Sequence, residues 1–190
     1  MKSSKYIVWS FLLLVFIAAL YRIIPGRPFG FAPQWAMAVF AGAVIKDKKW
    51  AFIIPVLSMF ISDMFYQVLY IGGLTIMQGF YEGQWQNYLL FAALVFVGFA
   101  IKRLNVWQII AASVAAPTLY FIASNFLVWA SNGAIRGLDR PKTFNGLMLC
   151  YTDAIPFYRM SILATLVFSG ILFGSFYLLQ MNAKRQTVKA

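Results

Sequence analysis

Residues 51–69 read AFIIPVLSMFISDMFYQVL, an apolar stretch with a single carboxylate, Asp63. A helix needs about 20 apolar residues to cross the hydrocarbon core of a bilayer, so this stretch predicts a transmembrane helix. An acidic side chain is costly inside a membrane. Asp63 is therefore a candidate for a functional role, with a structural hydrogen bond or ion pair as the equal alternative.

The rest of the chain also has the composition of a membrane protein. Of its 190 residues, 62% are hydrophobic and 11% are charged, whereas soluble domains carry about 25% charged residues. One cysteine and no histidine exclude a disulfide framework, a Cys/His zinc site and Ser-His or Cys-His catalysis. We therefore expect no enzyme activity, no catalytic residue, no metal and no cofactor.

The net charge of +11 does not indicate a nucleic-acid partner. The basic residues form short clusters between the apolar stretches, and no module that reads RNA or DNA is visible. Such clusters are typical of topology signals at a bilayer surface. The expected partner is the lipid bilayer.

The hydropathy pattern predicts an all-α polytopic membrane protein with about six transmembrane helices, in a single domain over residues 1–190. The second helix is too short to span, at about 20 Å, so residues 29–32 before it are expected to enter the membrane as a re-entrant loop. Such chain is tolerated only where protein or a wet cavity covers it. A short basic tail, residues 181–190, follows the last helix. Besides residues 51–69, the predicted helices are residues 6–24, 33–45, 87–101, 106–131 and 158–180.

Small residues in the second predicted helix indicate close helix packing. Ala38 and Gly42 are four residues apart and therefore lie on one face. The partner of this face can be another helix of the same chain or a helix of another protein, and the sequence leaves both open.

Lysine and arginine counts predict the orientation of the chain. With six helices, ten basic residues lie on the side of the two termini and six on the other side. The positive-inside rule places both termini in the cytoplasm. The outer side then carries the longer loops, residues 25–32, 70–86 and 132–157.

Polar side chains approach these outer loops from several helices. We expect them to converge on one ligand cavity of a few hundred cubic ångströms, since ligand sites combine apolar walls with a few polar groups. Arg159 or Arg27 is the expected partner of Asp63. The alternative is that helices simply become more polar toward their ends. The candidate ligand-binding residues are Asp63, Gln67, Asn125, Trp129, Tyr151, Asp153 and Arg159.

Several motifs resemble a family of small bacterial polytopic membrane proteins of uncharacterised function. These proteins are similar to the substrate-binding S components of energy-coupling-factor (ECF) vitamin transporters. The match runs over roughly residues 28–175. The motifs are FAP at residues 31–33, AMAVFAGA at 36–43, Pro55, Ser62-Asp63, SNFLVW at 124–129 and YTDAIPF at 151–157.

The resemblance implies a substrate-capture subunit that takes up a small cofactor-like solute across the bacterial inner membrane. It also implies a membrane coupling subunit with two ATPases as partners. This chain carries no Walker A motif, so any ATP hydrolysis would occur elsewhere. The alternative is a non-transporting scaffold or accessory subunit of a larger membrane complex.

The predicted orientation is testable with reporter fusions. A reporter that is active only in the periplasm should be silent after Ala190 and active after Gly83, because these positions lie on opposite sides. The reverse pattern would overturn the predicted topology.

Overall fold

The computed structural model describes residues 13–131 and 140–188, with side chains as far as Met181. The described chain is helical and contains no strand. Three of its helices are long and apolar enough to cross a membrane: α3, α6 and the Phe144–Met181 part of α7. These observations confirm an all-α fold compatible with a polytopic membrane protein. The helices are Leu13–Arg22, α2 (Gln34–Val44), α3 (Lys48–Ile71), α4 (Gln84–Ala93), α5 (Val95–Phe99), α6 (Val106–Ala130) and α7 (Phe144–Val188).

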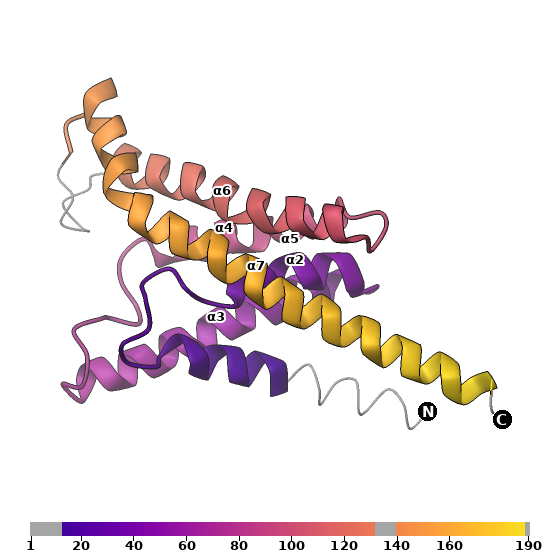
Figure 1. Ribbon diagram of the computed structural model, residues 1–190. Helices are drawn as coiled ribbons and strands as arrows, with labels where there is room; N and C mark the ends of the chain where they lie inside the picture. The colour runs from indigo at the N-terminus through magenta and orange to yellow at the C-terminus, as the bar shows by residue number, and fades with distance from the viewer. Residues whose placement is uncertain (1–12, 132–139, 189–190) are drawn as a thin grey trace.

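The helices run back and forth between two ends of an elongated bundle (Figure 1). In Figure 1, helix Leu13–Arg22 runs from the lower middle toward the left, whereas α7 runs from the upper left to the lower right. The loops of residues 23–33 and 72–83 lie at the opposite end, which we call the loop end. This arrangement agrees with an even number of passes through the membrane.

Two of the long helices begin at side chains that cap free backbone N–H groups. The Asp47 side chain accepts a hydrogen bond from the backbone N–H of Lys49, at 2.9 Å, where α3 begins. The Asn105 side chain accepts one from the backbone N–H of Gln108, at 2.8 Å, where α6 begins. Such caps satisfy donors that the helix itself leaves unpaired.

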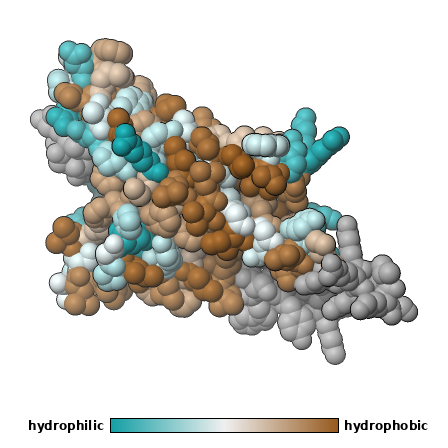
Figure 2. Space-filling view, in the orientation of Figure 1, coloured by the Kyte–Doolittle hydropathy of each residue, from teal (hydrophilic) through white to brown (hydrophobic). Residues whose placement is uncertain are grey.

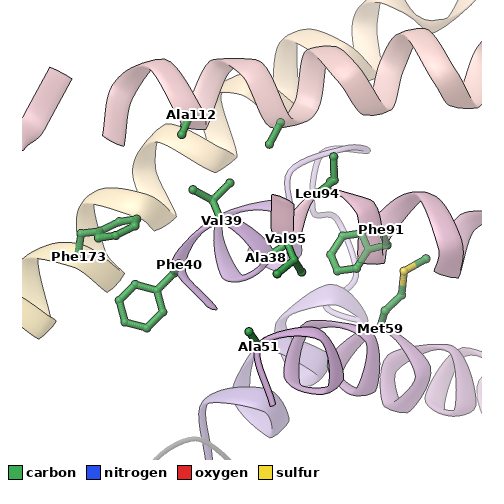
Figure 3. Close-up of a cluster of buried hydrophobic side chains, with 11 residues drawn as sticks. Ala38, Val39, Phe40, Ala51, Met59, Phe91, Leu94, Val95, Ala112 and Phe173 are labelled. Carbon is green, nitrogen blue, oxygen red and sulfur yellow. The ribbon is translucent and has the colours of Figure 1, made fainter. Parts of the chain in front are cut away.

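The short helix α2 is the centre of the structure. It packs against α3, α5, α6 and α7, and its residues 36–42 are all buried. Figure 3 shows the resulting core: Phe40 of α2 lies beside Phe173 of α7, and Phe91 of α4 lies on the other side of Ala38 and Val95 in the same cluster. Because α2 is covered on every side, its length is not limited by the need to span lipid.

Two glycines let α2 approach α5 backbone to backbone. A Cβ atom on Gly42 would lie 2.2 Å from the carbonyl oxygen of Val95, and one on Gly98 would lie 2.3 Å from that of Val39. Ala38 on the same face is fully buried. The small-residue face of Ala38 and Gly42 therefore has its partner within this chain.

The chain before α2 enters the bundle without helical structure, as predicted for a re-entrant loop. Ala32 and Pro33 are buried, and Gly30 has a φ of 82° that favours glycine. A Cβ on Gly30 would lie 2.4 Å from the carbonyl oxygen of Phe157 in α7. The protein thus covers the end of this non-helical segment next to α2, whereas Phe29 at its start is 56% exposed.

Two of the predicted helices differ clearly in their bounds from the structure, and residues 6–12 of the first predicted helix lie outside the described part of the chain. The fourth is interrupted at Leu94, which separates α4 from α5. The sixth begins at Phe144 rather than at residue 158 and continues to Val188, so it includes part of the expected outer loop and most of the expected tail. Apolarity alone misses residues 144–157 because their helix is supported by packing on α6. Residues 132–139 of the expected loop lie outside the described part of the chain.

The outer surface of the bundle suits a bilayer. Hydrophobic residues cover the middle of the face in Figure 2, and hydrophilic residues gather toward its ends. Large apolar side chains such as Phe60 of α3, Ile122 of α6 and Val167 of α7 are exposed. Lipid is the environment in which such a surface is stable.

The contact between Gly42 and α5 predicts a position-specific effect of a single methyl group. Gly42→Ala should destabilise the detergent-solubilised protein by about 1–3 kcal/mol, the usual cost of overpacking. Gly170→Ala in α7 is the matched control, because nothing lies within 4 Å of its added Cβ. Thermal unfolding should show a lower midpoint for Gly42→Ala only, and equal midpoints would contradict the packing.

Candidate functional site

Asp63 is the centre of a buried polar network at the loop end of α3. Its side chain is 2% exposed, and its Oδ1 atom forms an ion pair with Nη1 of Arg22. Its Oδ2 atom accepts hydrogen bonds from Nε2 of Gln84 at 2.5 Å and from the hydroxyl of Tyr88 at 2.8 Å. Both carboxylate oxygens are therefore occupied, as a buried charge requires.

The partner of Asp63 is Arg22, and the expected pairing with Arg159 or Arg27 is wrong. Arg22 is the last residue of helix Leu13–Arg22, whose buried face packs against α2 and α3. Its Nη1 atom also donates to the hydroxyl of Ser62, at 2.6 Å, and its guanidinium lies over the ring of Tyr66. The network thus joins the N-terminal helix to α3 and, through Gln84 and Tyr88, to α4.

Arg27 organises the loop that follows this helix. Its Nε atom donates to the backbone carbonyl of Arg22, at 3.2 Å. Its Nη1 atom donates to the carbonyls of Pro28, at 3.2 Å, and of Phe31. Tyr66 closes the same loop from α3, because its hydroxyl donates to the carbonyl of Arg22 at 2.6 Å.

A pocket of about 580 Å³ opens between this loop, α3 and the loop of residues 72–83. The volume is that of a small-molecule site. Its lining combines charged groups with aromatic and aliphatic walls. The lining residues are Arg22, Arg27, Phe29, Gly30, Ala32, Trp35, Asp63, Tyr66, Ile76, Met77, Gln78 and Tyr81.

Gln67 anchors the second loop rather than lining the pocket. Its Oε1 atom accepts a hydrogen bond from the backbone N–H of Phe80, at 3.1 Å. Gly79 next to it lies against α3, where a Cβ would come within 1.9 Å of the carbonyl oxygen of Asp63. The loop of residues 72–83 is therefore held on the same turn of α3 that carries Asp63.

The candidate residues of α6 bond to backbone groups and not to the pocket. The Asn125 side chain donates to the carbonyl of Phe121 at 2.8 Å, within α6. The indole N–H of Trp129 donates to the carbonyl of Pro141 at 3.0 Å. Neither residue lines the Asp63 pocket.

The candidate residues of α7 behave in the same way. The hydroxyl of Tyr151 donates to the carbonyl of Ile122 in α6, at 2.9 Å, and Asp153 forms an ion pair with Arg140 near the start of α7. Arg159 is exposed on α7. These three residues and the two of α6 belong to the contact between α6 and α7 or to its surface.

The prediction that the seven candidate residues meet in one cavity is therefore wrong. Asp63 lines the pocket and Gln67 supports its edge, whereas Asn125, Trp129, Tyr151, Asp153 and Arg159 lie outside it. The position of each residue along its helix was enough to predict its depth in the membrane. Depth alone does not say which helices are neighbours. Helix α3 packs against α2 and α4, and α6 packs mainly against α7.

Several residues of the site were not predicted: Arg22, Trp35, Tyr66, Gln84 and Tyr88. One signal for Arg22 was present, because an arginine that ends an apolar helix is a suitable partner for an acid at similar depth. Tyr66 also had one, since it lies three residues after Asp63 and so shares its face. Nothing in the sequence places the two residues of α4, or Trp35, beside the acid.

The arrangement is suited to binding. The described residues contain no group of three or more His, Cys, Asp or Glu side chains that could hold a metal ion. The one carboxylate of the pocket already accepts hydrogen bonds on both of its oxygens, from Arg22, Gln84 and Tyr88.

A family model described as "Family of unknown function (DUF6580)" matches residues 2–187 of the chain. Neither the curated proteins nor the solved structures gave a match. The geometry of the pocket is therefore the basis for a functional proposal.

The buried ion pair predicts strong coupling between Arg22 and Asp63. Arg22→Met and Asp63→Leu should each lower stability by about 3 kcal/mol or more, because each leaves an unpaired charge in an apolar environment. The double variant should be more stable than either single variant. A double-mutant cycle on thermal or chemical unfolding in detergent measures this coupling.

Asp153→Asn is the control for this cycle, because the ion pair of Asp153 with Arg140 lies at the surface. The side chains of Arg140 and Asp153 are 34% and 39% exposed. It should change stability by less than about 1 kcal/mol. Additive effects of the Arg22 and Asp63 substitutions would contradict the proposed pairing.

Proposed function

We propose that this chain, which belongs to the DUF6580 family of unknown function, is a substrate-capture subunit for a small solute. The solute binds in the pocket at the loop end. The observation that carries the proposal is a cavity of about 580 Å³ with a charged, pre-organised edge and aromatic walls. Ligand sites have this composition, and rigid polar networks of this kind hold binding groups in place.

The loops around the pocket support capture from outside the membrane. Both are tied to the helices by specific contacts, through Arg27 and Tyr66 on one side and Gln67 on the other. With the termini in the cytoplasm, these loops face the periplasm of the bacterial inner membrane. A solute would then reach the pocket before any movement of the helices.

Transport would require partners that this chain does not supply. The resemblance to S components of ECF transporters supports a membrane coupling subunit and two ATPases as those partners. The alternative function is a non-transporting scaffold of a membrane complex. It gains support from Asn125 and Trp129, which do not share the cavity of Asp63, but its predicted docking surface is not free. The small-residue face proposed for partner docking is occupied by α5 of the same chain.

Native mass spectrometry of gently solubilised protein tests the capture function. The protein should retain a small molecule of a few hundred daltons, since the pocket has the volume of such a ligand. Ile76→Trp should abolish this adduct, because Ile76 lines the pocket from an exposed loop position and can be enlarged without disturbing the core.

Leu74→Trp is the matched control on the same loop. Leu74 is 77% exposed, compared with 94% for Ile76, and it does not line the pocket. Its adduct should match that of the unmodified protein. A small-molecule adduct that survives Ile76→Trp would place the ligand elsewhere, and retention of a second protein in its place would favour the scaffold function.

A further inference from the structure

The charged groups of the pocket leave an unbalanced positive charge. Asp63 is fully used by Arg22, Gln84 and Tyr88, so it neutralises Arg22 and no further cation. Arg27 has no carboxylate partner among the described residues, because its bonds go to backbone carbonyls. Neutral carbonyls accept hydrogen bonds from its Nε and Nη1 atoms without cancelling its charge. Its Nη2 atom has no hydrogen-bond partner among the described residues.

Among the buried polar groups of the described lining, one further group is unmet, and it is also a donor. Trp35 of α2 lines the pocket, and its buried indole N–H has no hydrogen-bond partner within the described chain. The hydroxyl of Tyr66 is already used as a donor to Arg22. The Oε1 atom of Gln84 is an unpaired acceptor, but Gln84 lies behind Asp63 and outside the lining.

The walls of the pocket are mainly apolar. Phe29 and Tyr66 provide aromatic surface, and Ile76 and Met77 provide aliphatic surface. A ligand that matches the pocket therefore combines an oxygen-bearing negative charge with a compact apolar or aromatic body. Arginine is the side chain best suited to bind carboxylate and phosphate groups.

We infer that the solute captured here is a small organic anion, whose acidic group is bound by Arg27 beside the saturated Arg22–Asp63 pair. This inference rests on the proposed capture function and adds the charge class of the ligand. The alternative classes are cations, for which Asp63 would have to be free, and neutral solutes, which would leave the charge of Arg27 unbalanced.

Three aromatic probes of matched size test the charge class: benzoate, benzamide and benzylamine. Binding is measured by isothermal titration calorimetry on the full chain in nanodiscs of neutral lipid. Benzoate should bind about tenfold more tightly than the other two, because a charge-assisted hydrogen bond is roughly twice as strong as a neutral one. Arg27→Gln should remove this preference.

Because Arg27 also holds its loop, a second pair of variants keeps the test independent of folding. Ile76→Glu should weaken benzoate binding several-fold, and Ile76→Lys should leave it unchanged or strengthen it, since the exposed Ile76 lines the pocket. Leu74→Glu and Leu74→Lys on the same loop should have little effect. An equal response to both charges at residue 76 would overturn the inference.

The outcomes separate the inference from the proposed function. Tightest binding of benzylamine or benzamide, blocked by Ile76→Trp, would retain a capture site and overturn the anion class. No binding of any probe would overturn the anion class, whereas the capture function is overturned only if the protein also retains no small-molecule adduct in native mass spectrometry. Loss of benzoate binding in nanodiscs that contain phosphatidylglycerol would assign the anion site to a lipid headgroup and overturn a free solute.

Discussion

A carboxylate in an apolar helix must find a partner, and the Arg22–Asp63 ion pair meets this constraint here. Its position links helix Leu13–Arg22 to α3, and the remaining oxygen of Asp63 links α3 to α4 through Gln84 and Tyr88. The loops at this end are then built on the same residues, since Arg27 and Tyr66 both bond to the carbonyl of Arg22. The pocket lies between the two loops and α3, which these contacts hold in place.

The second constraint is the central position of the short helix α2. Its small residues allow close contact with α5 through Gly42 and Gly98, and its large ones, Val39 and Phe40, fill the core. Because α2 is only 11 residues long, the chain before it must enter the bundle as loop. That loop carries Phe29 and Gly30 into the pocket lining. The shortness of α2 therefore contributes directly to the wall of the pocket.

The last residues of α6 and the first residues of α7 show that polar side chains near a membrane surface need not form a ligand site. Trp129, Asn125 and Tyr151 all bond to backbone carbonyls, and Asp153 pairs with Arg140. Each bond satisfies a group that would otherwise be unpaired near lipid, which gives these residues a structural role of their own. Within the described part of the chain, the cluster around Asp63 combines charge, aromatic walls and open volume.

The amino-acid sequence was enough to predict the fold class, the long helices α3 and α6, the non-helical chain before α2 and the importance of Asp63. These features follow from hydropathy, helix length and the cost of a buried charge, which are local properties. Three features became visible in the folded structure alone: Arg22 pairs with Asp63, α5 covers Gly42, and residues 144–157 extend α7. Each depends on which helices are neighbours, and the hydropathy of one helix does not say which other helix packs against it.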